Sequence, residues 1–98
     1  MRILATVIAL AALLSGCASN EYLLGEDLYV RSCATCHGIE GEGGIGDAVG
    51  KGSNTDLSLT DEQIAGVITV GPGNMPGFSR LTQEQVDSLV LYMRSLAR

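Results

Sequence analysis

The chain is 98 residues long, and 46% of these are hydrophobic although only 4% are aromatic. A length of this order predicts a single domain, and the absence of tryptophan from the sequence predicts a thin core. Six Lys and Arg stand against eleven Asp and Glu, for a formal charge of −5. The sequence has no basic stripe, which argues against nucleic acid as a partner.

The first 16 residues have the layout of a secretory signal peptide. Arg2 supplies a positive charge, residues 3–14 form an almost unbroken apolar run, and small residues lead to Cys17. The run is shorter than the roughly 20 residues that a membrane-spanning helix needs, so we expect residues 1–16 to be removed. The sequence LSGC, which ends at Cys17, resembles the lipobox of bacterial lipoproteins, which implies that Cys17 is acylated. The alternative is a plain signal peptide with an incidental cysteine.

On this interpretation, residues 17–23 are the lipidated N-terminus and a short tether, and residues 24–98 are the folded domain. Six extended residues reach only about 20 Å. We therefore expect the domain to lie close to the membrane surface.

The first predicted helix covers residues 22–34. Leu24, Leu28 and Tyr29 share one face of this segment, as the period of an amphipathic helix requires. Gly25 costs up to about 1 kcal/mol in a helix interior relative to alanine. Its presence implies a packing reason.

Cys33 and Cys36 are three residues apart, and His37 follows at once. Two thiols at this spacing can form thioethers with both vinyl groups of a haem, while the adjacent histidine reaches the iron. A redox dithiol also uses this spacing, but it is expected in a βαβ setting, and no β-rich run precedes Cys33. A zinc site would need two further ligands from a sequence with one other cysteine and one histidine. The pattern favours one covalently bound haem c over these two alternatives.

A glycine-dense segment follows His37. We interpret it as a loop that wraps the haem edge, where positive φ angles and close backbone approach are needed. The seven glycines are Gly38, Gly41, Gly43, Gly44, Gly46, Gly50 and Gly52.

Two capping boxes predict two further helices. Thr60 is followed three residues later by Gln63, which predicts a short helix to about residue 70, ended by Gly71 and the proline after it. The same pattern at Thr82 opens the last helix, and no convincing strand remains. The apolar positions of these helices are Ile64, Val67 and Ile68, then Val86, Leu89, Val90, Met93, Leu96 and Ala97.

Met75 is the candidate for a second ligand of the iron. It lies in the uncharged run 70–79, whose glycines permit sharp turns and whose prolines limit flexibility. Met93 lies on the apolar face of the last helix, where a thioether is more often core filling than a ligand. The alternative is a sixth coordination site that is open or bound by water.

The CATCHG motif, the helical segment before it and Met75 in GNMPGF together resemble a class I c-type cytochrome over residues 21–96. The resemblance implies an all-α, class I cytochrome c-like fold with about three helices and glycine-rich loops around one covalent haem. It implies that Cys33 and Cys36 hold the haem and that His37 and Met75 ligate the iron.

The resemblance also implies a crossing of the first and last helices, with Gly25 and Tyr29 of the first matched to Leu89 and Tyr92 of the last. One departure lies in the glycine-rich loop. Many members of the family have a Gly, Pro, x, Leu run whose proline carbonyl accepts the proximal imidazole N–H, but this chain has GDAV at residues 46–49. A backbone carbonyl is available from any residue, so the sequence does not identify which carbonyl accepts the imidazole N–H.

The function that the resemblance implies is single-electron transport by a lipid-anchored monohaem protein, without an enzymatic reaction or a small-molecule substrate. The expected location is extracytoplasmic, facing the periplasm, or the outer face of the cell membrane in a Gram-positive host. Because the chain is acidic, we expect redox protein partners with a basic docking face. The alternatives are a haem subunit of a larger membrane oxidase or dehydrogenase, and a haem sensor or peroxidase with an open sixth site.

Overall fold

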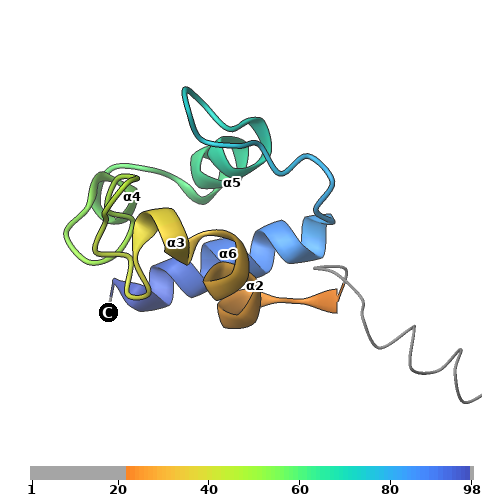
Figure 1. Ribbon diagram of the computed structural model, residues 1–98, viewed down its shortest axis with the longest axis horizontal. Helices are drawn as coiled ribbons and strands as arrows, with labels where there is room; N and C mark the ends of the chain where they lie inside the picture. The colour runs from red at the N-terminus through yellow and green to blue at the C-terminus, as the bar shows by residue number, and fades with distance from the viewer. Residues whose placement is uncertain (1–21, 98) are drawn as a thin grey trace, which may run out of the picture.

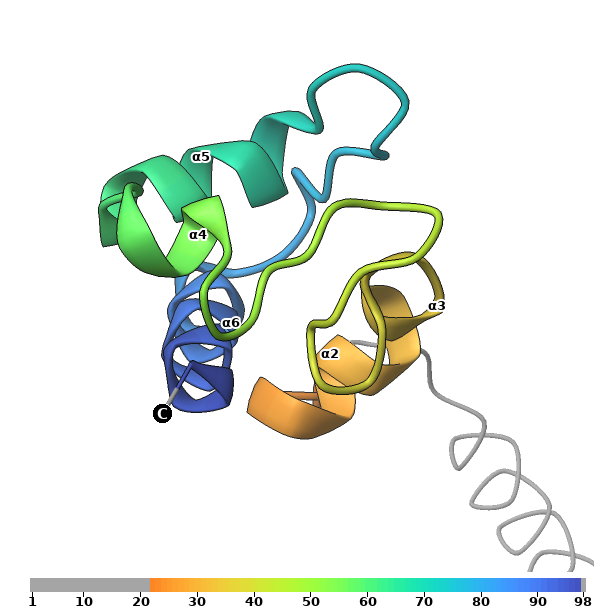
Figure 2. The same cartoon turned by 90° about the vertical axis from the view of Figure 1, so that its left-hand side faces the viewer.

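The computed structural model describes residues 22–97, so the expected signal peptide, Cys17 and most of the tether lie outside the described residues. This range contains five helices: α2 (Gly25–Ser32), α3 (Ala34–His37), α4 (Asn54–Leu57), α5 (Asp61–Val70) and α6 (Gln83–Leu96). It contains no strand, in agreement with the all-α expectation. α2 and α5 both pack on α6, on different sides of it (Figure 1; Figure 2). None of the helices in this range has the length and apolar character needed to cross a bilayer.

The expected helix over residues 22–34 is wrong in its bounds. α2 begins only at Gly25, and Cys33, with φ −122° and ψ −37°, separates it from α3. Leu24 is the N-cap residue rather than a core position, and 43% of its surface is exposed. Gly25 has a φ of +53°, which L side chains rarely adopt, and its N–H donates to Ser88 Oγ at 2.9 Å. A Cβ at Gly25 would meet no atom within 4 Å, so its backbone conformation, and not close packing, calls for glycine.

The crossing of the first and last helices is confirmed. The rings of Tyr29 in α2 and Tyr92 in α6 lie 5.2 Å apart between centroids and are tilted by 59°. Leu28, Tyr29 and Leu89 are the largest fully buried side chains among the described residues. The largest fully buried side chains therefore belong to the two helices that cross.

Both capping boxes are confirmed. The Thr60 hydroxyl accepts from the Gln63 N–H at 3.1 Å, and the Thr60 N–H donates to the Gln63 side chain at 2.9 Å. Thr82 and Gln85 form the same reciprocal pair at the start of α6. α5 ends at Val70, and the C-cap residue Gly71 has a φ of +68° and donates its N–H to the Val67 carbonyl. These two helices therefore begin where the local sequence predicts.

The core that the helices enclose is small. Partly buried residues, including Leu23, Val49 and Leu59, surround it. Such a core agrees with the sequence-based expectation of a thin core. The buried cluster comprises Leu28, Tyr29, Ala34, Ile64, Ile68, Leu89, Val90 and Met93.

α4 was not predicted from the sequence. It has four residues, none of them buried, and its N-cap Ser53 accepts from the Asp56 N–H at 3.2 Å. So short a segment has no apolar period to detect. Its position depends on contacts with distant parts of the chain.

Candidate functional site

Cys33, Cys36 and His37 are brought together by the break between α2 and α3. The Cys33 carbonyl accepts from the N–H groups of both Cys36 and His37, at 3.2 and 3.0 Å, so the motif is one tight helical turn. Cys33 and His37 line the same cavity, whereas Cys36 is half-buried outside its lining. Both cysteines are free thiols in the structure.

The orientation of His37 is determined by the loop that follows it. His37 Nδ1 lies 2.6 Å from the backbone carbonyl of Asp47. A carbonyl can only accept, so Nδ1 is the donor in this contact, and Nε2 of the neutral ring has a lone pair that can bind a metal. The carbonyl acceptor that the sequence left open is therefore that of Asp47.

The glycine-rich loop folds back over the C-terminal end of α3. The N–H of Gly46 donates to the Cys36 carbonyl, and the N–H of Gly43 donates to the His37 carbonyl, both at 2.7 Å. A Cβ at Gly46 would lie 2.9 Å from His37 Cε1, closer than real Cβ atoms approach a neighbour. Glycine at this position lets the loop lie against the imidazole ring.

Met75 is carried by a closed loop between α5 and α6. The Phe78 N–H donates to the Ile68 carbonyl at 2.9 Å, which returns the chain to the end of α5. At the neck of this loop, the backbones of Gly71 and Gly77 are in direct contact, because a Cβ on Gly71 would overlap the Gly77 nitrogen. Met75 is half-buried and lines the same cavity as His37.

The cavity has a mainly apolar wall. It holds only about 60 Å³ and is partly open to solvent. None of its lining residues is charged. The lining residues are Tyr29, Cys33, His37, Val49, Thr55, Leu59, Ile64, Val67, Ile68, Met75 and Met93.

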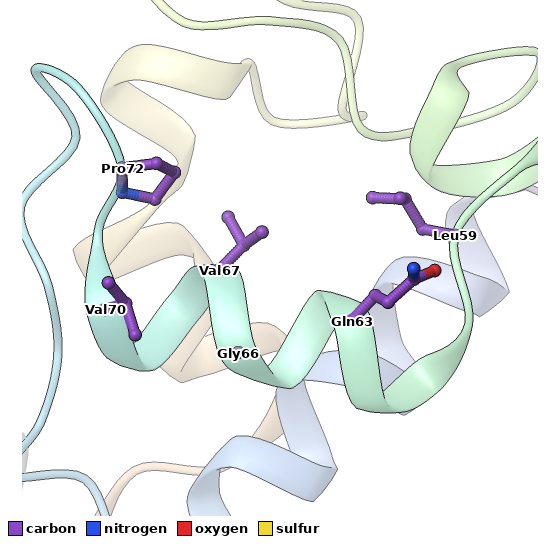
Figure 3. Close-up of a pocket in the computed structure, with 6 residues that line it drawn as sticks. All are labelled: Leu59, Gln63, Gly66, Val67, Val70 and Pro72. Atoms are coloured by element: carbon purple, nitrogen blue, oxygen red, sulfur yellow. The ribbon is translucent and has the colours of Figure 1, made fainter.

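A second hollow of about 400 Å³, largely open to solvent, lies along α5 and shares Leu59 and Val67 with the first. Figure 3 shows Leu59, Val67 and Pro72 projecting to the same side of α5. We therefore treat the two hollows as one cleft. Val67, predicted to belong to the apolar face of its helix, is 37% exposed because it faces this cleft.

Burial also affects the ionisable groups at the site. It raises the pKa of the Cys33 thiol to about 11, and the nearby Cys36 adds to the shift. A reactive dithiol needs a lowered thiol pKa, so this environment disfavours the dithiol alternative. Burial likewise raises the pKa of Tyr29 to about 12, and its hydroxyl donates to the Gly38 carbonyl at 2.7 Å.

The residues present fit a covalently bound haem. One imidazole and two thioethers, those of Met75 and Met93, face an uncharged cavity, and two thiols lie in the turn beside it. Soft sulfur and imidazole ligands suit a haem iron. Within residues 22–97, no three His, Cys, Asp or Glu side chains form a group that could hold a metal ion.

Residues of the cleft that the sequence did not single out come from separate parts of the chain. Val49 follows the glycine-rich loop, Thr55 lies in α4, and Leu59 lies in the segment before α5. No spacing rule links them to the CATCH motif. Only Val67 could have been identified as a cleft residue from the sequence, because it makes the apolar face of α5 wider than the contact with α6 requires.

The fold and the donor set together define a class, that of small all-α c-type cytochromes. Comparison with known proteins gives the family: residues 20–93 match cytochrome C oxidase, cbb3-type, subunit III, and the chain belongs to this family. Its cofactor is haem c. The individual ligand roles remain predictions.

Curated relatives and a solved structure agree with this assignment. The chain is 32% identical over 77 residues to the cytochrome bc1 complex cytochrome c subunit of Mycobacterium tuberculosis, covering 76% of this chain and 27% of that protein. The subunit of the same name from Corynebacterium diphtheriae is 32% identical over 73 residues, covering 72% of this chain and 26% of that protein. The chain thus spans about a quarter of the length of these relatives.

Among solved structures, the KustC0563 c-type cytochrome is similar, with a TM-score of 0.67 and 28% sequence identity. The match covers 78% of this chain and all of that one. The chain is therefore similar to an entire c-type cytochrome domain, as well as to a portion of the longer relatives.

Proposed function

We propose that this chain is a monohaem electron carrier in which Cys33 and Cys36 bind the haem covalently and His37 and Met75 ligate its iron. The observation that carries the proposal is that His37 and Met75, which lie 38 positions apart in the sequence, line one uncharged cavity. Bound haem supplies a reversible one-electron couple. No residue of the cavity wall is a charged acid or base that would serve a substrate reaction.

The surrounding residues would tune that couple. The Asp47 carbonyl holds the His37 ring in one orientation and makes Nε2 a better donor. The soft thioether of Met75 favours reduced iron, and the apolar wall disfavours the extra charge of oxidised iron. Both effects raise the reduction potential, so we expect a moderately high value.

For the N-terminal region, we propose a signal peptide at residues 1–16, a lipidated tether at 17–23 and the cytochrome domain at 24–98. Acylation of Cys17 would anchor the protein outside the cytoplasm. Leu23 contacts the core, and its carbonyl accepts from the Gln85 side chain at 3.1 Å. This position, six residues after Cys17, supports a domain held near the membrane surface.

We propose redox proteins with a basic docking face as partners, because the chain is acidic. A second role, as a haem subunit of a larger membrane complex, is favoured by the names of the curated relatives, which are bc1 complex subunits. Extraction in mild detergent separates the two roles. A free carrier is extracted from the membrane without other proteins, whereas a subunit co-purifies with other redox proteins.

The ligand assignment is tested by the visible spectrum of the haem-loaded protein. Ferric iron bound by a thioether has a weak red charge-transfer band, which we expect in the wild type. Two methionines line the cavity, so two variants are compared: the band should disappear in Met75→Ala and persist in Met93→Leu. The reverse result would make Met93 the ligand. A haem spectrum without the band in the wild type would favour a sensor or peroxidase with an open sixth site.

A further inference from the structure

Arg94 forms an extended side-chain network in the described part of the chain. It lies in the last turn of α6, and only 25% of its side chain is exposed. Its Nη1 donates to the carbonyl of Thr55 at 2.9 Å and is 3.4 Å from that of Asp56. Its Nη2 donates to the Leu59 carbonyl at 2.7 Å, and its Nε donates to Asp61 Oδ1 at 3.0 Å.

Two of these acceptors, the carbonyls of Thr55 and Leu59, belong to residues in one wall of the haem cavity. Thr55 and Leu59 both line the cavity, and they are in α4 and in the short segment between α4 and α5. α4 has no buried residue. Within residues 22–97, Arg94 supplies the hydrogen bonds that reach this segment from a distant part of the chain, whereas the others are local.

The guanidinium group suits this task in a way that an ammonium group does not. Its donors lie in one plane on three separate nitrogens, so they can satisfy carbonyls and a carboxylate in different directions. A lysine at position 94 would keep the charge but would present all its donors from one atom. The contacts that hold the wall therefore need arginine itself.

We infer that Arg94 is a positioning residue of the haem cavity: it fixes the Thr55 to Leu59 wall on α6 and so limits how much water reaches the haem. The inference rests on the proposed function for its effect on the haem, but the position of the wall is independent of it. A displaced wall would admit water beside the iron centre, and a more polar environment favours the oxidised state. Loss of the contacts should therefore lower the reduction potential.

The test is amide hydrogen exchange of the haem-loaded protein, together with its midpoint potential. The amides of Leu57, Ser58 and Leu59, which donate to carbonyls of Ser53 and Asn54, report the wall. In Arg94→Met and in Arg94→Lys, we expect exchange at these amides to rise at least tenfold, with a lowered potential. Amides of α2 should keep their wild-type protection.

Two further variants isolate the cause. Asp61→Asn removes the ion pair but keeps the carbonyl contacts, so it should retain most of the wall's protection. Arg31→Met removes one exposed positive charge from α2 and should leave both protection and potential unchanged. Arg94→Lys, which keeps the charge, separates the loss of contacts from the loss of the positive field.

Wild-type exchange at the wall amides in both Arg94 variants would overturn the inference. An equal rise in α2 would also overturn it, because the role would then be one of general stability. A reduction potential that falls in Arg94→Met but stays unchanged in Arg94→Lys would refute the proposed effect of the wall on the haem. The loss of the positive charge would then explain the change in potential. If the wild type lacks the red thioether band, the proposed ligation fails, whereas exchange at the wall still decides the role of Arg94.

Discussion

Replacing Gly71 by alanine tests whether close backbone contact holds the loop that carries Met75. Gly71 has a φ of +68°, and an added Cβ would overlap the Gly77 nitrogen and lie 2.5 Å from the carbonyl carbon of Pro76. The neighbours are backbone atoms, so no side chain can rotate away. The neck of the loop would have to open, and Met75 would move with it. The matched control is Gly73→Ala in the same loop, where φ is +61° and the added Cβ would meet nothing within 4 Å.

The two substitutions share one cost and differ in another. Alanine in the left-handed region costs about 1–2 kcal/mol per residue, and its stiffening of the unfolded chain returns about 0.4–1 kcal/mol. Gly73→Ala should therefore destabilise the protein by about 1 kcal/mol. The overlap at Gly71 adds an overpacking cost of about 1–3 kcal/mol, so Gly71→Ala should lose about 2–4 kcal/mol.

The assay is guanidinium unfolding of the haem-loaded ferric protein, followed by far-ultraviolet circular dichroism and by the red thioether band. In Gly71→Ala, we expect the band to be lost at a lower denaturant concentration than the helical signal. In Gly73→Ala, the two should disappear together. Equal losses of stability in the two variants, with the band intact in both, would refute the argument from close contact.

Three further outcomes follow from the packing and the ionisable groups. Tyr92→Ala removes one ring of the tilted pair, and because Tyr92 is only partly buried we expect the free energy of unfolding in urea to fall by about 2 kcal/mol. A decrease well below 1 kcal/mol would argue against the crossing as a main source of stability. The pKa of Tyr29 is about 12 in the folded state against about 10 when unfolded, so its contribution to the free energy of unfolding should be fully present below pH 10 and decrease as the pH rises toward 12. In Tyr29→Phe, the free energy of unfolding should decrease less steeply over this pH range, and an unchanged slope would count against the assignment. The double variant Cys33→Ala, Cys36→Ala should lack covalent haem and be largely disordered by circular dichroism, because the polypeptide core is small; near-normal helix content would contradict this.

Features that depend on neighbouring residues were predictable from the sequence. The capping boxes at Thr60 and Thr82 place the starts of α5 and α6, because each box is a set of contacts within four residues. The apolar period of the last helix likewise predicts the buried positions Val86, Leu89, Val90 and Met93. The CATCH motif points to haem c because its chemistry needs only three side chains close together in sequence.

The bounds of the first helix were predicted less well. The predicted helix runs through Cys33 to residue 34, but the backbone breaks at Cys33. Gly25 begins the helix with a positive φ, and its N–H donates to Ser88 of α6. Periodicity describes which side of a helix is apolar. It carries no information on a backbone turn that a distant hydrogen bond stabilises.

The sequence by itself therefore determined the class of cofactor, the all-α fold and the two helices with capping boxes. Only the tertiary structure decided that the Asp47 carbonyl holds His37, that Gly71 and Gly77 close the Met75 loop, and that Arg94 anchors the wall of the cavity. The physical reason lies in the groups involved. Backbone carbonyls and close approaches of main-chain atoms are available to every residue type, so the sequence leaves no mark of which of them are used until the chain has folded.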